Sequence, residues 1–302
     1  MQSQAILLIV ISAFTHAGWN LVGKHERPTL TFFMVALSFG CLALLPVVWS
    51  QLHLIAQFPK AVWIPLLAGG VFQTLYHASL AGAYRCGELS VVYPMARALP
   101  LVFVAMGSIL LGRGSEISML CLGGCLLIVA GCLVLPLATF RDFKPSSWLN
   151  ASAPLALAAA LATVGYSFMD DHCMRLISDH LQGESSTFRL ALLYLFIQTV
   201  IALAMMIPPA ISNASERAEV TRLTPKRLRN AIVTGLGIVG TYSLVLTAMT
   251  YASDVTYIVA FRQLSIPIGA ILGVVLLGEK QTIPKAVGLG TISIGLLLVA
   301  AG

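Results

Sequence analysis

The chain alternates between long apolar stretches and short polar turns over its whole length. A helix needs about 20 consecutive apolar residues to cross the ~30 Å hydrocarbon core of a bilayer. Ten stretches approach that length, and they cover residues 4–22, 29–50, 61–82, 89–111, 117–138, 150–170, 187–208, 229–250, 254–278 and 283–301. The pattern therefore predicts an all-α polytopic membrane protein with ten transmembrane helices.

The composition favours a membrane environment over a soluble one. Of the 302 residues, 58% are apolar and only 10% are charged, and the mean hydropathy is +0.90. Soluble domains carry roughly 25% charged residues, so the lipid bilayer must be the main solvent here. The first stretch has no Lys or Arg before it and has a counterpart in the second half, so it is interpreted as a mature helix and not as a cleaved leader.

The net charge of +6 does not indicate a nucleic-acid partner, because Lys and Arg lie mostly beside predicted membrane ends, where lipid headgroups attract them. The densest basic group lies in the longest loop, which is expected to be a solvated or interfacial connector: Arg217, Arg222, Lys226, Arg227 and Arg229. Cys121, Cys125 and Cys132 share one helical stripe and are expected to pack against a neighbouring helix. No metal or cofactor is predicted.

Two segments of the chain repeat one pattern. Residues 83–112 and 248–279 each contain an acidic turn, an aromatic residue, one arginine, a proline and a closing Leu-Leu-Gly. The matched pairs are Glu88 and Asp254, Tyr93 and Tyr257, Arg97 and Arg262, and Pro100 and Pro267. A weaker match pairs Gly18-Trp19-Asn20 with Gly165-Tyr166-Ser167.

The duplication divides the chain into two five-helix units, residues 1–140 and 148–302. Because each unit has an odd number of spans, the second unit must enter the membrane from the opposite side. The sequence thus predicts two inverted five-helix repeats, an architecture typical of secondary transporters.

Several of these residues resemble motifs of one known family. They are Asn20 and Lys24, the stretch Ala83–Pro100 with Ser90-Val91-Val92-Tyr93-Pro94, and Leu276-Leu277-Gly278-Glu279. With them the chain resembles the drug/metabolite transporter superfamily, EamA-type branch. The resemblance implies carriage of amino acids, drugs or other metabolites, usually export, across a bacterial inner membrane. Gly112-Arg113 stands where the family more often has Gly-Glu, so no role is carried onto Arg113.

Arg97 and Arg262 are the formal charges that the sequence places well inside predicted spans. An arginine at mid-helix costs about 2.5–3.5 kcal/mol on insertion scales, so it normally faces protein or a wet cavity. Each lies about 12 Å from the start of its stretch at the helical rise. Entry from opposite faces then brings both to similar depth, where they would favour an anionic carboxylate or phosphonate. In the alternative reading, each arginine cross-links helices by binding carbonyls or an Asp.

Polar and aromatic side chains share helical faces with the arginines or with one another. Gln73, Tyr76 and His77 lie on one face of their stretch, and His16, Trp19 and Asn20 lie on one face of theirs. The predicted substrate-binding residues are Trp19, Tyr76, His77, Tyr93, Arg97 and Arg262, with Gln198 and Tyr242 as weaker candidates. Such residues also hold transmembrane helices together by hydrogen bonds, which is the alternative.

A proton-coupled carrier needs a group that titrates in the working range. His77 is a hypothetical proton relay on its intrinsic pKa. The acids are expected at the ends of spans: Glu88 and Asp254 as helix N-caps, and Asp170 and Asp171 as solvated residues at the end of stretch 150–170.

Glycines and prolines predict local helix geometry. Gly235-Leu-Gly-Ile-Val-Gly matches the nucleotide-binding pattern GxGxxG, but it lies in an apolar span with no preceding strand, so close helix packing is expected. Pro94, Pro100 and Pro267 remove backbone donors and predict kinks that serve as hinges or as fixed bends.

Two questions remain open at this level. Twelve Lys and Arg lie in odd-numbered loops and four in even ones, so the positive-inside rule places both termini outside the cytoplasm. The family resemblance implies the opposite orientation. The oligomeric state is also open, and a monomer is plausible.

The sequence is best interpreted as a secondary transporter and not as an enzyme. Its substrate would be a small organic metabolite, such as an amino acid or a phosphonate, with protons as a candidate coupling ion. A polytopic membrane enzyme and a non-transporting accessory subunit are the alternatives.

Overall fold

The structure is a computed structural model that describes residues 3–23, 28–86, 89–142, 152–221, 224–278 and 281–302. All regular secondary structure in these ranges is helical, as predicted. The α-helices are α1 (Ser3–Gly23), α2 (Leu30–Val48), α3 (Trp63–Cys86), α4 (Leu89–Ser108), α5 (Met119–Val134), α6 (Ala153–His180), α7 (Thr187–Ser212), α8 (Ala214–Thr221), α9 (Pro225–Met249), α10 (Val255–Phe261), α11 (Ser265–Leu277) and α12 (Ile283–Ala301).

Side-chain caps explain where many of these helices begin. The hydroxyls of Thr29, Ser118, Ser186, Thr224 and Thr282 each accept from a backbone N–H in the first turn of α2, α5, α7, α9 and α12. Asp254 does the same for α10, as predicted for this acid. Each cap satisfies a backbone donor that the helix leaves free.

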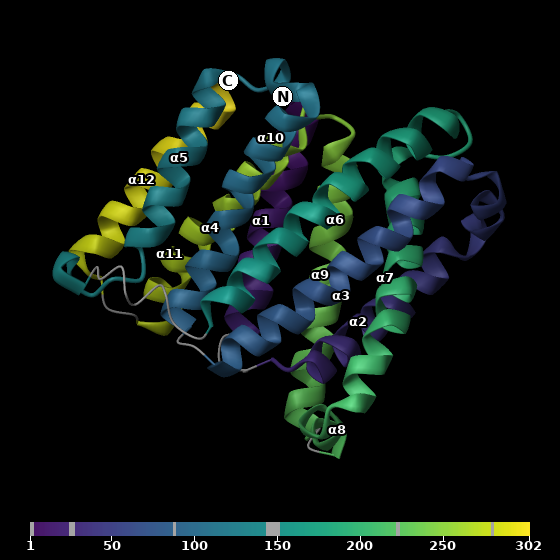
Figure 1. Cartoon of the computed structure of the whole chain (residues 1–302), viewed down its shortest axis with the longest axis horizontal. Helices are drawn as coiled ribbons and strands as arrows, with labels where there is room; N and C mark the ends of the chain where they lie inside the picture. Colours follow the sequence, from purple (N-terminus) through teal and green to yellow (C-terminus); the bar gives the residue numbers. More distant parts are fainter. Residues whose placement is uncertain (1–2, 24–27, 87–88, 143–151, 222–223, 279–280) are drawn as a thin grey trace.

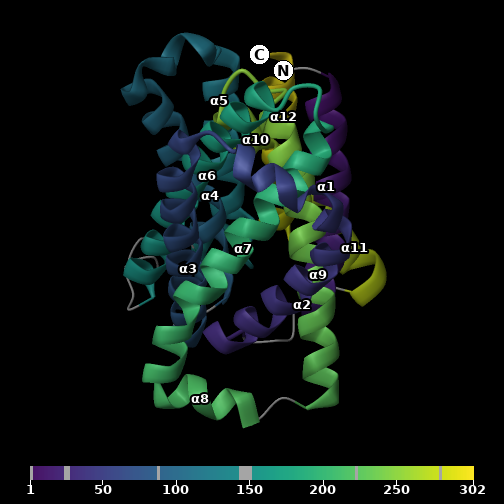
Figure 2. The ribbon, with the colours of Figure 1, turned by 90° about the vertical axis from the view of Figure 1, so that its right-hand side faces the viewer.

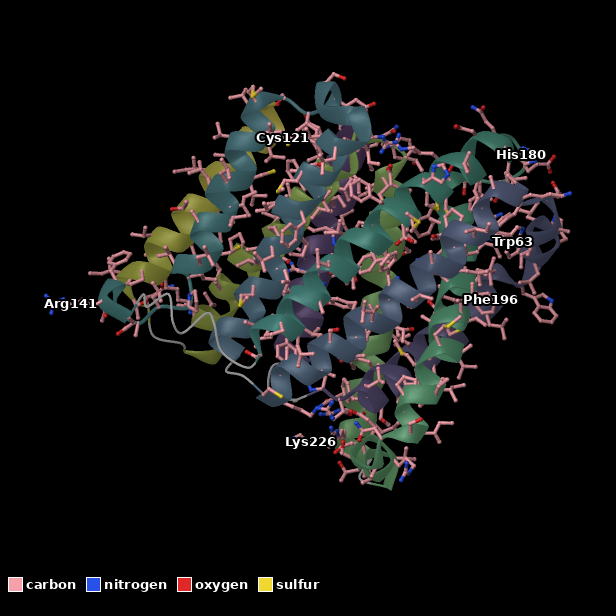
Figure 3. All side chains as sticks on the ribbon, viewed as in Figure 1. Trp63, Cys121, Arg141, His180, Phe196 and Lys226 are labelled. Atoms are coloured by element: carbon pink, nitrogen blue, oxygen red, sulfur yellow. The ribbon has the colours of Figure 1, made fainter. Side chains whose placement is uncertain are left out.

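The helices have the lengths and surfaces of an integral membrane protein. Within the described part of the chain, seven are long and apolar enough to cross a bilayer. Large apolar side chains stand on the outer flanks of these helices and of the shorter apolar helix α5: Leu297 on α12 is 69% exposed, and Leu126 on α5 is 66% exposed. Arg141, His180 and Lys226, in contrast, lie at the ends of the molecule (Figure 3). Lipid is the solvent that suits such flanks.

The helices pack in pairs that join distant parts of the sequence. At one edge of the molecule α5 lies along α12, and α2, α3 and α7 lie toward the opposite edge (Figure 1). Between them, α3 packs on α6, α1 on α9, and α4 on α6. Both termini lie at one end of the bundle and α8 at the other, in both views (Figure 2).

Glycines allow several of these helices to approach closely. A Cβ at Gly235 of α9 would lie 1.9 Å from the carbonyl oxygen of Ala36 on α2. The predicted packing role of the GxGxxG sequence is confirmed at this glycine. Along α5 and α12, the same clash would occur between backbones at Gly124 with Gly295, and at Gly131 with Gly288.

The predicted stretch 254–278 is not one continuous helix. A 3-10 turn, η7 (Arg262–Leu264), separates α10 from α11. Pro267 lies four residues after Gln263 and has no N–H to donate to the Gln263 carbonyl, so an α-helix cannot continue unchanged through this point. A 3-10 turn thus lies where Pro267 removes a backbone donor, whereas α4 continues as an α-helix through Pro100 to Ser108.

Two connections differ from the expectation. The helix predicted to end at residue 170 continues to His180. The basic loop predicted as a solvated connector contains α8, whose Glu216 is only 2% exposed. Glu216 accepts from the Thr31 N–H at 2.9 Å and pairs with Arg85 at 2.8 Å. This acid could not be recognised as buried in a loop dominated by positive charge, because its partners come from two other helices.

Replacing Gly235 by Ala tests the close approach of α2 and α9. The new methyl group meets a backbone carbonyl that cannot rotate away, so we expect a loss of about 1–3 kcal/mol of stability, measured by thermal unfolding in detergent. Gly240→Ala is the matched control on the same helix, because a Cβ there meets nothing within 4 Å and alanine favours helix by about 1 kcal/mol. Equal melting temperatures for the two variants would contradict the packing.

Candidate functional site

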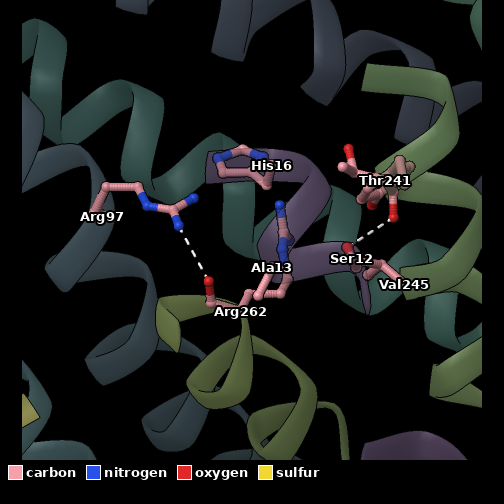
Figure 4. A pocket seen from close by; sticks show the side chains of 8 residues that line it. Ser12, Ala13, His16, Arg97, Thr241, Val245 and Arg262 are labelled. Atoms are coloured by element: carbon pink, nitrogen blue, oxygen red, sulfur yellow. Dashed lines mark hydrogen bonds between the residues drawn. The ribbon is translucent and has the colours of Figure 1, made fainter. Parts of the chain in front are cut away.

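Arg97 and Arg262, from different halves of the chain, meet between α4 and the break that follows α10. The Arg97 Nη2 donates to the Arg262 carbonyl at 3.2 Å and to the Ser265 hydroxyl at 2.7 Å (Figure 4). In return, the Gln263 Nε2 donates to the Arg97 carbonyl at 3.1 Å. The Arg262 carbonyl also accepts from the N–H and the hydroxyl of Ser265, so this one oxygen gathers donors from both halves of the chain.

The arginine pair borders two hollows. Hollow A, with a cavity volume of about 20 Å³, lies between α1, α4, α9 and η7, and its wall includes Ser12, His16, Thr241 and Tyr242 besides Arg97 and Arg262 (Figure 4). Hollow B, also about 20 Å³, lies between α3, α4, α6, α10 and η7, and its wall includes Tyr76, Thr163, Tyr166 and Gln263 besides the same two arginines. Each hollow therefore combines two positive charges with hydroxyl groups.

A row of aromatic rings runs beside the hollows from α2 to α9. Phe33 and His77 contact edge to face at 4.8 Å, and His77 and Tyr76 at 5.0 Å. The row continues from Tyr76 to Tyr166 and from Tyr166 to Tyr242, each at 5.9 Å. Such edge-to-face contacts fix ring orientation. The hydroxyl-bearing walls of the hollows are therefore held by packing across four helices.

The Arg262 guanidinium lies over the last ring of this row, 5.5 Å from the centroid of Tyr242. A cation on an aromatic face gains about 0.5–2 kcal/mol, and more where water is scarce. Arg262 is thus supported by a ring, and a hydrogen bond with Tyr166 also holds its side chain. Arg97 Nε is buried and has no partner among the described residues, so the pair retains donor capacity.

Asp170 is a buried carboxylate beside the aromatic row, and the expectation that it is solvated was wrong. Its side chain is 0% exposed, in the second half of α6. Its Oδ1 accepts from the Tyr194 hydroxyl at 2.7 Å and from the Gln198 Nε2 at 2.5 Å. Its Oδ2 accepts from the Tyr242 hydroxyl. Two helices, α7 and α9, are therefore bound to α6 through one carboxylate.

Asp171 is also buried, at 1% exposed, contrary to the expectation, but its partners are charged. It pairs with Arg113 at 3.1 Å and with Arg175 at 2.9 Å. Arg113 also lies 3.8 Å from Asp254, which accepts from the Ser108 hydroxyl. These charges tie the connection after α4 to α6 and to the start of α10, at the end of the bundle that carries both termini (Figure 1).

The structure places only some of the predicted binding residues on the walls of the hollows. The structure brings Arg97, Arg262 and Tyr76 to the walls of the hollows. His77 is 5% exposed and lies in the aromatic row behind Tyr76, with its Nδ1 2.7 Å from the Gln73 carbonyl. The side chains of Trp19 and Tyr93 fall outside the described residues. Contact of any of these residues with a substrate stays a prediction.

Sequence reasoning missed Asp170 because it ended the span at the first charged residue. A helix boundary drawn from hydropathy treats every carboxylate as an exit from the membrane. One signal was available: Tyr166 and Asp170, like Tyr194 and Gln198, are spaced i, i+4 and so form polar stripes that continue one helical face. A stripe of that kind at the end of an apolar run indicates a helix that continues within protein.

Comparisons with known proteins establish the fold and nothing finer. No family model and no curated protein matches the chain. Twenty-eight chains of solved structures are similar to it. One of them, described only as the crystal structure of a protein, has a TM-score of 0.72 and 16% identity, covering 100% of this chain and 99% of that chain. The helical arrangement is thus shared over the full length.

The hydrogen bond from Tyr194 to Asp170 provides a test of the buried network. Hydrogen bonds to charged groups contribute about 1.5–3 kcal/mol, so Tyr194→Phe should lower the melting temperature in detergent by several degrees. Tyr251→Phe is the same exchange at a partly exposed tyrosine and should have little effect. Indistinguishable melting curves for both variants would show that this bond does not stabilise the bundle.

Proposed function

We propose that this chain is a secondary transporter that moves a small anionic organic metabolite across the membrane by alternating access. In this proposal ten spans form two inverted five-helix repeats, as in the EamA-type branch of the drug/metabolite transporter superfamily, with a location in a bacterial inner membrane. Hollows A and B are the two parts of the substrate path. The observation that carries the proposal is the arginine pair shared by both hollows.

The packing of the helices supports the repeat. If α1 corresponds to α6, α2 to α7, α3 to α9 and α5 to α12, then exchanging the two units turns the α3–α6 contact into the α9–α1 contact. The same exchange turns α2–α9 into α7–α3 and leaves α5–α12 unchanged. The glycine contacts Gly124–Gly295 and Gly131–Gly288 also interchange. A contact pattern that survives exchange is expected of two copies related by a two-fold axis.

Exchanging the two units also interchanges residues that line the two hollows. The displacement along the chain that carries Arg97 onto Arg262 also carries Tyr76 of hollow B onto Thr241 of hollow A. Hollow A is bordered by α1 and α9, and hollow B by their counterparts α6 and α3. An arginine pair common to both is well placed to hold a substrate while access changes from one hollow to the other.

The charges of the hollows favour an anion. Two guanidiniums line each hollow, and no carboxylate is among the described residues that line them. Asp170 lies behind Tyr242 and not on a wall. Guanidinium groups match carboxylate and phosphonate oxygens in shape and charge. Amino acids and phosphonates are therefore the proposed substrate class, with export the more common direction in the family that the sequence resembles.

A ligand-stabilisation screen tests the proposed substrate class. Among carboxylates, amino acids and phosphonates, we expect at least one compound to raise the melting temperature of the detergent-purified protein, since a ligand at about 100 times its Kd adds about 2.7 kcal/mol. Arg97→Ala should abolish that ligand-induced shift. Arg189→Ala removes an exposed arginine of α7 and should leave it intact.

Transport itself requires a second measurement with the best compound of the screen. Proteoliposomes loaded with unlabelled compound should accumulate the labelled compound by counterflow, and Arg97→Ala should lose this exchange. Formation of a chemically altered product would instead favour a membrane enzyme. Binding without counterflow or product would favour an accessory subunit, and either result would contradict the transporter proposal.

A further inference from the structure

Among the described residues, every hydrogen-bond partner of Asp170 is neutral. The groups that contact it are the hydroxyls of Tyr194 and Tyr242 and the amide of Gln198. The Gln73 Nε2 extends this network by donating to the Gln198 Oε1 at 3.0 Å. Burial of an ionised carboxylate without a cation is costly unless hydrogen bonds compensate. These hydrogen bonds stabilise an ionised Asp170, but none of the partners carries a positive charge that would demand it.

The adjacent Asp171 shows what a purely structural carboxylate looks like here. Protonation of Asp171 would leave Arg113 and Arg175 without their counter-ion. Protonation of Asp170 leaves no paired cation without its counter-ion, because its hydrogen-bond partners are neutral. A tyrosine hydroxyl both donates and accepts, so the bond with Tyr242 can be kept with its direction reversed. Asp170 can therefore take up a proton without breaking an ion pair.

Tyr242 connects this carboxylate to the substrate path. Its hydroxyl binds Asp170, its ring lines hollow A, and the Arg262 guanidinium lies 5.5 Å over that ring. On the other side, Tyr166 lies one turn before Asp170 on α6, lines hollow B and contacts the Tyr242 ring. A change in charge at Asp170 thus changes the electrostatic potential at Arg262, which borders both hollows.

The other titratable and charged groups around this network come from five different helices and from η7. They are Tyr76 and His77 on α3, Arg97 on α4, Tyr194 on α7, Tyr242 on α9, Arg262 in η7 and Cys173 on α6 itself. His77 contacts the Gln73 carbonyl, and Cys173 lies 3.6 Å from the Val62 carbonyl. Asp254 on α10 faces Ser108 instead. Asp170 is the carboxylate that this arrangement places beside the hollows.

We propose, on the basis of the transporter function proposed above, that Asp170 is the proton-binding site of the carrier and that an anion beside Arg262 favours its protonated form. An anion cancels part of the positive field that stabilises the carboxylate. Linkage then requires that the bound proton strengthens anion binding by the same factor. Proton and anion are therefore bound together and move in the same direction, so an inward proton gradient would drive uptake of the anion, and export would be driven by the anion's own outward gradient.

Infrared difference spectroscopy of the purified protein tests proton binding without any substrate. Lowering the pH should produce the carbonyl-stretch band of a protonated carboxyl group, and Asp170→Asn should remove one component of it. Asp179→Asn removes an exposed acid of the same helix and should leave that component in place. If Asp170→Asn keeps the same carbonyl-stretch component that Asp179→Asn keeps, Asp170 does not bind the proton.

The coupling to Arg262 has its own readout, the titration midpoint of the same component. Arg262→Gln removes the cation and should shift the midpoint upward by roughly one pH unit. Tyr242→Phe removes a donor to the carboxylate and should shift it in the same direction, which keeps the test decisive if one variant does not fold. An unchanged midpoint in the variants that fold would overturn the coupling. These spectra are independent of counterflow, so failure of the transporter proposal and failure of this site are distinguishable.

Discussion

The contact between Arg97 and the interrupted helix at Arg262 is the interaction on which the centre of the bundle depends. A guanidinium inside a membrane protein needs acceptors, and regular helices offer almost none because their carbonyls are already bonded. At η7 the Arg262 carbonyl accepts from Arg97 in addition to the N–H and hydroxyl of Ser265, and Arg97 also donates to the Ser265 hydroxyl. Pro267 removes the donor that would bind the Gln263 carbonyl in this turn. The break, the charge and the hollows are therefore consequences of one local arrangement, which also joins the two halves.

The sequence predicted those features that follow from periodicity and duplication. Apolar length located the long helices but not α8, and the matched pattern around Arg97 and Arg262 predicted similar depths for two residues that the structure brings together. What it could not predict depends on partners from other helices. Glu216 and Asp171 are buried because arginines of distant segments reach them. Hydropathy assigns a carboxylate to water unless its partner is known, and partners are a tertiary property.

Asp170 and Asp171 show how adjacent residues on one helix acquire different chemistry. Successive positions on an α-helix point about 100° apart, so one carboxylate faces α7 and α9 while the other faces the connection after α4. Their neighbours make Asp171 an anchor, held by two arginines, and Asp170 a site with neutral donors. The same residue type is therefore held by cations at one position and by neutral donors at the next, and the proposed proton site rests on this difference.

If the two halves are copies of one unit, as proposed, they differ in charge at matched positions. The displacement that carries Gly18-Trp19 onto Gly165-Tyr166 carries Gly23 onto Asp170, and His77 stands where the second unit has Tyr242. Only the second unit thus carries the carboxylate and its tyrosine, among these equivalent positions. Tyr242, which binds Asp170, lines hollow A, whereas the equivalent position His77 lies behind the wall of hollow B. The gradients set the direction of transport, and in the proposed carrier this asymmetry determines which hollow lies beside the group that binds the proton.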